Sequence, residues 1–144
     1  MSVRWLRRGV VHAYAAVPAS VPAVRRAIER FAQEAGVDEA MLGSIRLAVT
    51  EACTNAVVHA YVGAAEPGTF TVSAEVLDDE EPRMLRIVVT DEGRGMVPRL
   101  DSPGIGFGLP IIAQVAEAFE LRSAHETGGT EVCMRFSLSA VAAP

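Results

Sequence analysis

The chain of 144 residues carries 13 basic and 18 acidic residues, which gives a formal net charge of −5, and half of its residues are hydrophobic. This acidity argues against a nucleic-acid partner, and no run approaches the roughly 18 apolar residues that a membrane-spanning helix needs. The length predicts a single domain over residues 1–144, with its core at about residues 10–138.

The N-terminus faintly imitates a signal peptide, because basic residues precede a fairly apolar stretch at residues 9–19. His12 and Tyr14 interrupt that stretch, so we expect a strand near Val10–Val17 and a cytoplasmic protein that is not secreted. Cys53 and Cys133 have no metal-ligand spacing around them and are predicted to be buried free thiols in a reducing compartment.

Two helices follow in the predicted order. Ser20 is placed to cap the first helix, with Pro22 in its first turn, and Gly36 is expected to stop it after about Ala35. Asp38 is placed to cap a longer second helix that ends near Tyr61.

The rest of the chain is predicted to form mainly strands. Apolar residues alternate from Phe70 to Val76, which is typical of a half-buried strand. Three more strands and a third helix are predicted at Met84–Thr90, Leu109–Ala118 (the helix), Phe119–Ala124 and Thr130–Leu138. These elements predict an α+β fold: a two-layer sandwich in which a mixed β-sheet carries its helices on one face.

A polar stripe runs along the predicted second helix. Glu51, Asn55 and His59 are four residues apart, so their side chains lie on one face of that helix. A carboxylate can act as a general base, and an amide oxygen can ligate a hard cation such as Mg²⁺. Taken alone, the stripe would favour the simpler interpretation of a polar seam that faces solvent.

Two glycine-rich segments give the stripe a context. Asp91, Gly93 and Gly95 directly follow an apolar strand, which places a carboxylate beside backbone that a ligand can approach closely. Gly104, Gly106 and Gly108 precede a predicted helix, whose N-terminus favours phosphate. Either segment alone is a weak signal.

Together, the three segments in this order resemble the ATP-binding fold of gyrase, heat-shock chaperones, histidine kinases and MutL-type proteins (the Bergerat fold). Gly128-Gly129-Thr130 is similar to the closing element of that fold before its last strand. Within the superfamily, the run from Glu51 to Tyr61 most resembles the bacterial anti-sigma-factor serine/threonine kinases. The resemblance covers about residues 20–137.

This resemblance implies that the chain binds ATP and Mg²⁺. It implies that Asn55 holds Mg²⁺, that Asp91 reads the adenine with support from Thr130, and that Glu51 is the catalytic base. Backbone at Gly93, Gly95, Gly104, Gly106 and Gly108 would line the nucleotide. His59 is open between a phosphate contact and a structural histidine.

The implied partners are a sigma factor and an anti-anti-sigma protein of the STAS type, whose serine or threonine would accept phosphate. The relatives work as homodimers, and the sequence does not establish that state for this chain. Only Met96–Pro103 separates the two glycine segments, a short lid for this family, and Pro103 stands where a cation often precedes the last glycines. These departures bear on ATP retention and on the rate of transfer.

Other functions stay open. The chain is also consistent with a nucleotide-dependent protein-binding module that transfers little or no phosphate, or with a simple ATPase. The catalytic domain of a histidine kinase is a third alternative, but neither His12 nor His125 lies in a helical dimerisation context.

Overall fold

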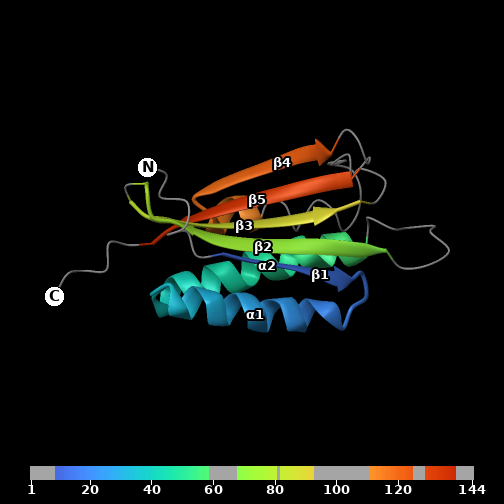
Figure 1. Cartoon of the computed structure of the whole chain (residues 1–144), viewed down its shortest axis with the longest axis horizontal. Coiled ribbons are helices and arrows are strands. Elements are labelled where there is room, and N and C mark those ends of the chain that lie inside the picture. Colours follow the sequence, from blue (N-terminus) through green and yellow to red (C-terminus); the bar gives the residue numbers. More distant parts are fainter. Residues whose placement is uncertain (1–8, 59–67, 81, 93–110, 125–128, 139–144) are drawn as a thin grey trace.

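The computed structural model describes residues 9–58, 68–80, 82–92, 111–124 and 129–138. Figure 1 shows a β-sheet with two long helices on one side of it. The elements are β1 (Gly9–Ala15), α1 (Ser20–Glu34), α2 (Glu39–Val58), β2 (Thr69–Leu77), β3 (Met84–Asp91), β4 (Ala118–Ala124) and β5 (Gly129–Ser137).

The sheet has the strand order β1-β2-β3-β5-β4, and every neighbouring pair is antiparallel. The expected α+β sandwich with helices on one face is therefore confirmed, whereas the expectation of a mixed sheet was wrong. The two helices lie between β1 and β2 in the chain, so β2 starts at the end of the sheet where β1 stops and runs antiparallel to it. β3 and β4 do run the same way, but β5 lies between them, so they do not pair.

Caps explain where the helices begin and end. The Met41 N–H donates to the Asp38 Oδ1 at 2.8 Å, which confirms Asp38 as the cap of α2. Ser20 does not cap α1: it is the first helical residue, and its N–H bonds the Val17 carbonyl in the preceding turn. Gly36 follows the last turn at φ 90°, a conformation that favours glycine, so α1 ends where the sequence predicts.

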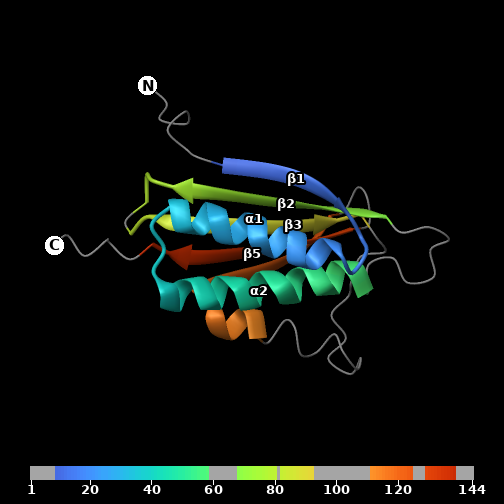
Figure 2. The same cartoon turned by 90° about the horizontal axis from the view of Figure 1, so that it is seen from below.

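The core lies between the sheet and the helices. Alternate residues of the strands face the helices and are buried, led by Phe70, Leu85, Ile87, Met134 and Phe136. Figure 2 shows α1 and α2 side by side across this face, with a short helix at residues 111–115 along the far side of α2. That helix ends at residue 115, before the predicted Ala118, and β4 already begins at Ala118; residues 109–110 of the predicted helix lie outside the described residues.

None of the helices in the described part of the chain is long and apolar enough to cross a membrane. Both cysteines are buried and free, as the sequence predicts.

Burial of Cys53 inside this core has a consequence for alkaline stability. Desolvation raises the pKa of its thiol to about 12. In the unfolded chain a thiol titrates near pH 8.5, so above that pH only the unfolded state loses the proton and folding becomes less favourable. Between pH 7.5 and pH 10, we expect the free energy of unfolding to fall by about 2 kcal/mol more in the wild type than in Cys53→Ala. Urea titrations at both pH values measure this, and equal losses in the two proteins would contradict it.

Candidate functional site

A row of paired residues crosses the sheet near one end of its strands β1, β2, β3 and β5. Tyr14 pairs with Phe70, Phe70 with Asp91, and Asp91 with Thr130. Paired residues of antiparallel strands share a face, and the buried Phe70 places this row on the side of the helices. The register therefore brings together two residues that are 39 positions apart, Asp91 and Thr130, as the sequence expectation requires.

Asp91 and Thr130 are both polar and both buried, at 4% and 2% exposure. Buried polar groups are costly unless they form hydrogen bonds, and both residues have interaction partners in the structure. A carboxylate next to a hydroxyl presents several acceptor positions and one donor at a fixed place. Such a pair suits recognition of an exocyclic amine on a nucleotide base.

Tyr14 and Phe70 support this end of the sheet. Their rings stack with centroids 5.7 Å apart and an interplanar angle of 25°. Burial is the larger cause of a raised Tyr14 pKa, and Cys53 on α2 adds to it. The sequence analysis gave neither aromatic residue a role at the site, because their pattern predicts only strands that pack against the core.

Gly129 fixes how closely β5 approaches the end of β3. A Cβ at this position would lie 1.9 Å from the Asp91 carbonyl oxygen and 2.9 Å from the Glu92 Cα. Both atoms belong to backbone, so no side chain can turn away to make room. The glycine thus permits the contact that sets Asp91 beside Thr130, a requirement that is visible in the sequence only as part of a Gly-Gly-Thr run.

Gly129→Ala is therefore expected to lower the free energy of unfolding by about 1–3 kcal/mol or more, because β5 must move away from β3. Gly43→Ala is the matched control. Nothing lies within 4 Å of its added Cβ, and it sits inside α2, so it should stabilise the protein by about 0.5–1 kcal/mol. Thermal unfolding of the two variants measures the contrast, and equal stability of Gly129→Ala and the wild type would show that the contact is not needed.

Glu51 and Asn55 lie one turn apart on α2. Glu51 is half-buried, whereas Asn55 is only 3% exposed. The Asn55 Nδ2 has no hydrogen-bond partner among the residues that the structure describes. An unsatisfied buried amide costs about 1–3 kcal/mol, which fits a group placed to meet a ligand.

The other predicted site residues lie outside the described residues. These are His59, Gly93, Gly95, Gly104, Gly106 and Gly108. The four that the structure describes come from three elements: α2 carries Glu51 and Asn55, β3 ends at Asp91, and β5 carries Thr130. α2 packs against both β3 and β5, so the helix residues and the strand pair belong to one side of the sheet.

The described residues contain no group of three or more histidine, cysteine, aspartate or glutamate side chains that would hold a metal by themselves.

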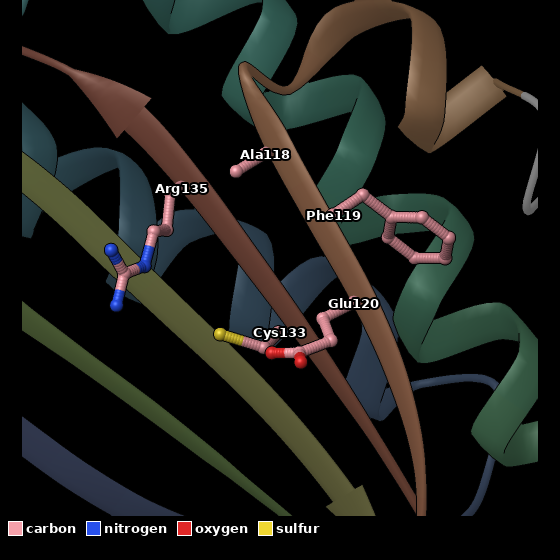
Figure 3. A pocket seen from close by; sticks show the side chains of 5 residues that line it. All are labelled: Ala118, Phe119, Glu120, Cys133 and Arg135. Carbon is pink, nitrogen blue, oxygen red and sulfur yellow. The ribbon is translucent and has the colours of Figure 1, made fainter.

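A separate hollow of about 340 Å³ lies over β4 and β5, lined by Ala118, Phe119, Glu120, Cys133 and Arg135. Figure 3 shows the Phe119 ring directed away from the side chains of Cys133 and Arg135. Both charged lining residues are ion-paired, Glu120 to Arg122 at 2.7 Å and Arg135 to Glu80 at 3.5 Å. The hollow contains none of the predicted site residues.

Residues 14–136 match the histidine kinase-like ATPase domain family. One similar protein is the Serine-protein kinase RsbW of Bacillus licheniformis, 36% identical over 78 residues, which cover 54% of this chain and 46% of the relative. Another is an Anti-sigma F factor of Caldanaerobacter subterraneus, 27% identical over 115 residues, which cover 72% of this chain and 76% of the relative.

The fold is also similar to a solved structure. The crystal structure of the RsbU and RsbW domains of a Mycobacterium tuberculosis protein aligns with a TM-score of 0.69 and 21% identity. The alignment covers 90% of this chain and 32% of that protein, and it supports the fold alone.

Proposed function

Because the chain belongs to the histidine kinase-like ATPase family, we propose that it is an ATP-dependent protein serine/threonine kinase that regulates a sigma factor. Its substrate is a serine or threonine of an anti-anti-sigma protein of the STAS type, and it also sequesters the sigma factor. The names of two relatives, a serine-protein kinase and an anti-sigma factor, support the two halves of this proposal.

The observation that carries the proposal is the pair Glu51 and Asn55 on adjacent turns of α2. Asn55 is buried with its Nδ2 unpartnered among the described residues, and Glu51 remains partly accessible one turn away. In this role the Asn55 side-chain oxygen would hold Mg²⁺, which would neutralise charge on the phosphates, and the unpartnered Nδ2 would donate to a phosphate oxygen.

Glu51 acts on the acceptor hydroxyl. Its carboxylate takes the hydroxyl proton while the acceptor oxygen forms a bond to the γ-phosphorus. The bond from that phosphorus to the β–γ bridging oxygen breaks, and ADP leaves with the electron pair. The same carboxylate would serve a water molecule, so simple ATP hydrolysis is the side reaction to monitor.

Asp91 and Thr130 read the adenine in this proposal. The carboxylate of Asp91 accepts a hydrogen bond from the exocyclic amine, and the Thr130 hydroxyl supports it directly or through water. Their burial and their shared register keep both groups in place. The backbone N–H groups of Gly93, Gly95, Gly104, Gly106 and Gly108, which lie outside the described residues, would cradle the phosphates in this proposal. His59 also lies outside them and stays open between a phosphate contact and a structural histidine.

The testing experiment measures transfer of label from γ-labelled Mg-ATP to the STAS-domain proteins encoded in the same genome. Label on a serine or threonine of one of them supports the kinase and identifies its substrate. Absence of label on all of them, with nucleotide still bound, favours a nucleotide-dependent binding module. The short segment Met96–Pro103 is the observation that favours this binding module over a kinase.

A further inference from the structure

α2 is apolar on nearly every side, although the elements that the structure describes cover only part of it. Its 20 residues include three charged ones, Glu39, Arg46 and Glu51. The sheet covers one face, while α1 and the helix at residues 111–115 flank the two sides (Figure 2). A helix with apolar residues all round is normally buried all round, so the uncovered face of α2 is the exception.

Two of the three large hydrophobic side chains that are exposed in the described residues lie on this uncovered face. Leu47 is 42% exposed and Val58 is 51% exposed. They lie four residues before and seven residues after Glu51, so the three side chains form one stripe along the helix. We call Leu47, Glu51, Thr54 and Val58 the outer stripe of α2.

The outer stripe contains a single ionisable side chain. Arg46, the neighbouring cation, is turned toward α1, where its Nε lies 2.6 Å from the Glu29 Oε1. Arg25 shares the same carboxylate at 3.9 Å, so the charges of this region are gathered between the two helices. Glu51 is thus the one carboxylate of the stripe, with Leu47 one turn before it and Val58, beyond Thr54, two turns after it.

We propose that the outer stripe is the docking surface for the phospho-acceptor protein, and that Leu47 makes the apolar contact that holds this protein beside Glu51. This inference rests on the proposed kinase function and adds its substrate-binding face. A polypeptide whose acceptor serine or threonine is flanked by apolar side chains fits the stripe, since apolar contacts on either side leave the hydroxyl opposite the carboxylate.

The position of Glu51 favours the phospho-acceptor protein over a sigma factor or a second copy of the chain as the molecule that docks on the stripe. Residues one helical turn apart have Cβ atoms about 5–6 Å apart, so a partner that covers Leu47 also reaches the carboxylate. Covering the stripe removes water around Glu51, which favours transfer to the acceptor over hydrolysis. A sigma factor or a second copy of the chain on the same stripe would instead block access to Glu51.

The test compares Leu47→Ser with Val11→Ser, using the STAS-domain protein that the wild type labels. Val11 is 67% exposed but lies on β1, paired with Ser73 on the sheet face away from the helices. We expect Leu47→Ser to raise the KM for the acceptor protein about tenfold, because a buried leucine contact is lost, with kcat within about twofold of wild type. Val11→Ser should leave both unchanged, and Mg-ATP affinity should be the same in all three proteins.

Equal KM values in Leu47→Ser and the wild type would overturn the proposal. A loss of Mg-ATP affinity in Leu47→Ser would also overturn it, because the stripe would then serve the nucleotide. A drop in sigma-factor affinity or in dimer content without a change in KM would assign the stripe to one of those occupants.

Calorimetry separates this proposal from the kinase itself. If the wild type transfers no label, binding of each STAS-domain protein to Mg-ATP-loaded Glu51→Ala and to Glu51→Ala/Leu47→Ser decides the question. About tenfold weaker binding in the double variant supports the docking surface even though the kinase has failed. Equal binding, or none in either protein, overturns the docking surface as well.

Discussion

Glu51→Ala is expected to lower the rate of phosphoryl transfer by ~10²–10⁴-fold, the usual contribution of a general base, while Mg-ATP affinity stays close to that of the wild type. The reason is the position of Glu51: it is half-buried within the outer stripe of α2, whereas the proposed nucleotide contacts are those of Asn55, Asp91 and Thr130. Single-turnover transfer from labelled Mg-ATP gives the rate, and equilibrium binding of a fluorescent ATP analogue gives the affinity.

Glu51→Gln serves as the matched variant. It keeps the size and hydrogen-bonding reach of the side chain but cannot accept the proton as a carboxylate does. A loss of rate in both variants identifies base catalysis. Full activity in Glu51→Gln would show that Glu51 acts by positioning alone, and full activity in Glu51→Ala would remove it from the reaction.

The order of elements was predictable from the sequence because most of the local signals agree with the tertiary structure. Alternation from Phe70 to Val76 and the run from Met84 to Thr90 became β2 and β3 within one residue at each end. Asp38 caps α2 as expected. The resemblance to the histidine kinase-like ATPase fold is confirmed by the family match over residues 14–136. Similarity to a serine-protein kinase RsbW and to an anti-sigma F factor supports the resemblance to the anti-sigma-factor kinases.

The predictions that were wrong, the Ser20 cap and the mixed sheet, depend on contacts between elements. Ser20 has the right residue type for a cap, but the carbonyl groups of Val17 and Pro18 already bind the first N–H groups of α1. The sheet is antiparallel where the described strands pair, because β5 inserts between β3 and β4. Neither strand insertion nor a competing carbonyl leaves a periodic signal in the sequence.

The candidate site was likewise predictable in its local features but not in those that depend on contacts between elements. The spacing of Glu51 and Asn55 alone places them on one face of a helix. The burial that distinguishes them, with Asn55 covered and Glu51 accessible, follows from how α2 packs on β3 and β5. The pairing of Asp91 with Thr130 needs the β3–β5 register, and the role of Gly129 appears only when its distance to the Asp91 carbonyl is known.

In the proposed function, Asn55 is a residue whose role opposes the stability of the protein. A helix that presents apolar residues to the sheet would be more stable with an apolar residue at this buried position, because the amide gains no partner for its Nδ2 among the described residues. Its presence against that preference is best explained by a ligand that satisfies it. ATP with Mg²⁺ supplies both the cation and phosphate oxygens.

Asn55→Ala is accordingly expected to weaken Mg-ATP binding by roughly 10–100-fold, the loss that follows when one interaction with a charged ligand is removed. Its effect on the free protein should be small. Removing the unsatisfied Nδ2 gains about 1–3 kcal/mol, which offsets the cavity left by the shorter side chain. We expect the free energy of unfolding without nucleotide to change by less than about 1 kcal/mol.

Val49→Ala is the control for Asn55→Ala, because Val49 is buried on the same helix at 1% exposure and has no polar group to satisfy. That variant should lose about 1–3 kcal/mol of stability while it keeps its affinity for Mg-ATP. Urea unfolding with and without Mg-ATP measures all four quantities. If Asn55→Ala unfolds as easily as Val49→Ala and still binds Mg-ATP, then Asn55 is a packing residue and the magnesium assignment fails. If Asn55→Ala keeps its stability but loses the nucleotide, the buried amide is a ligand-binding group that α2 holds at a cost to its own packing.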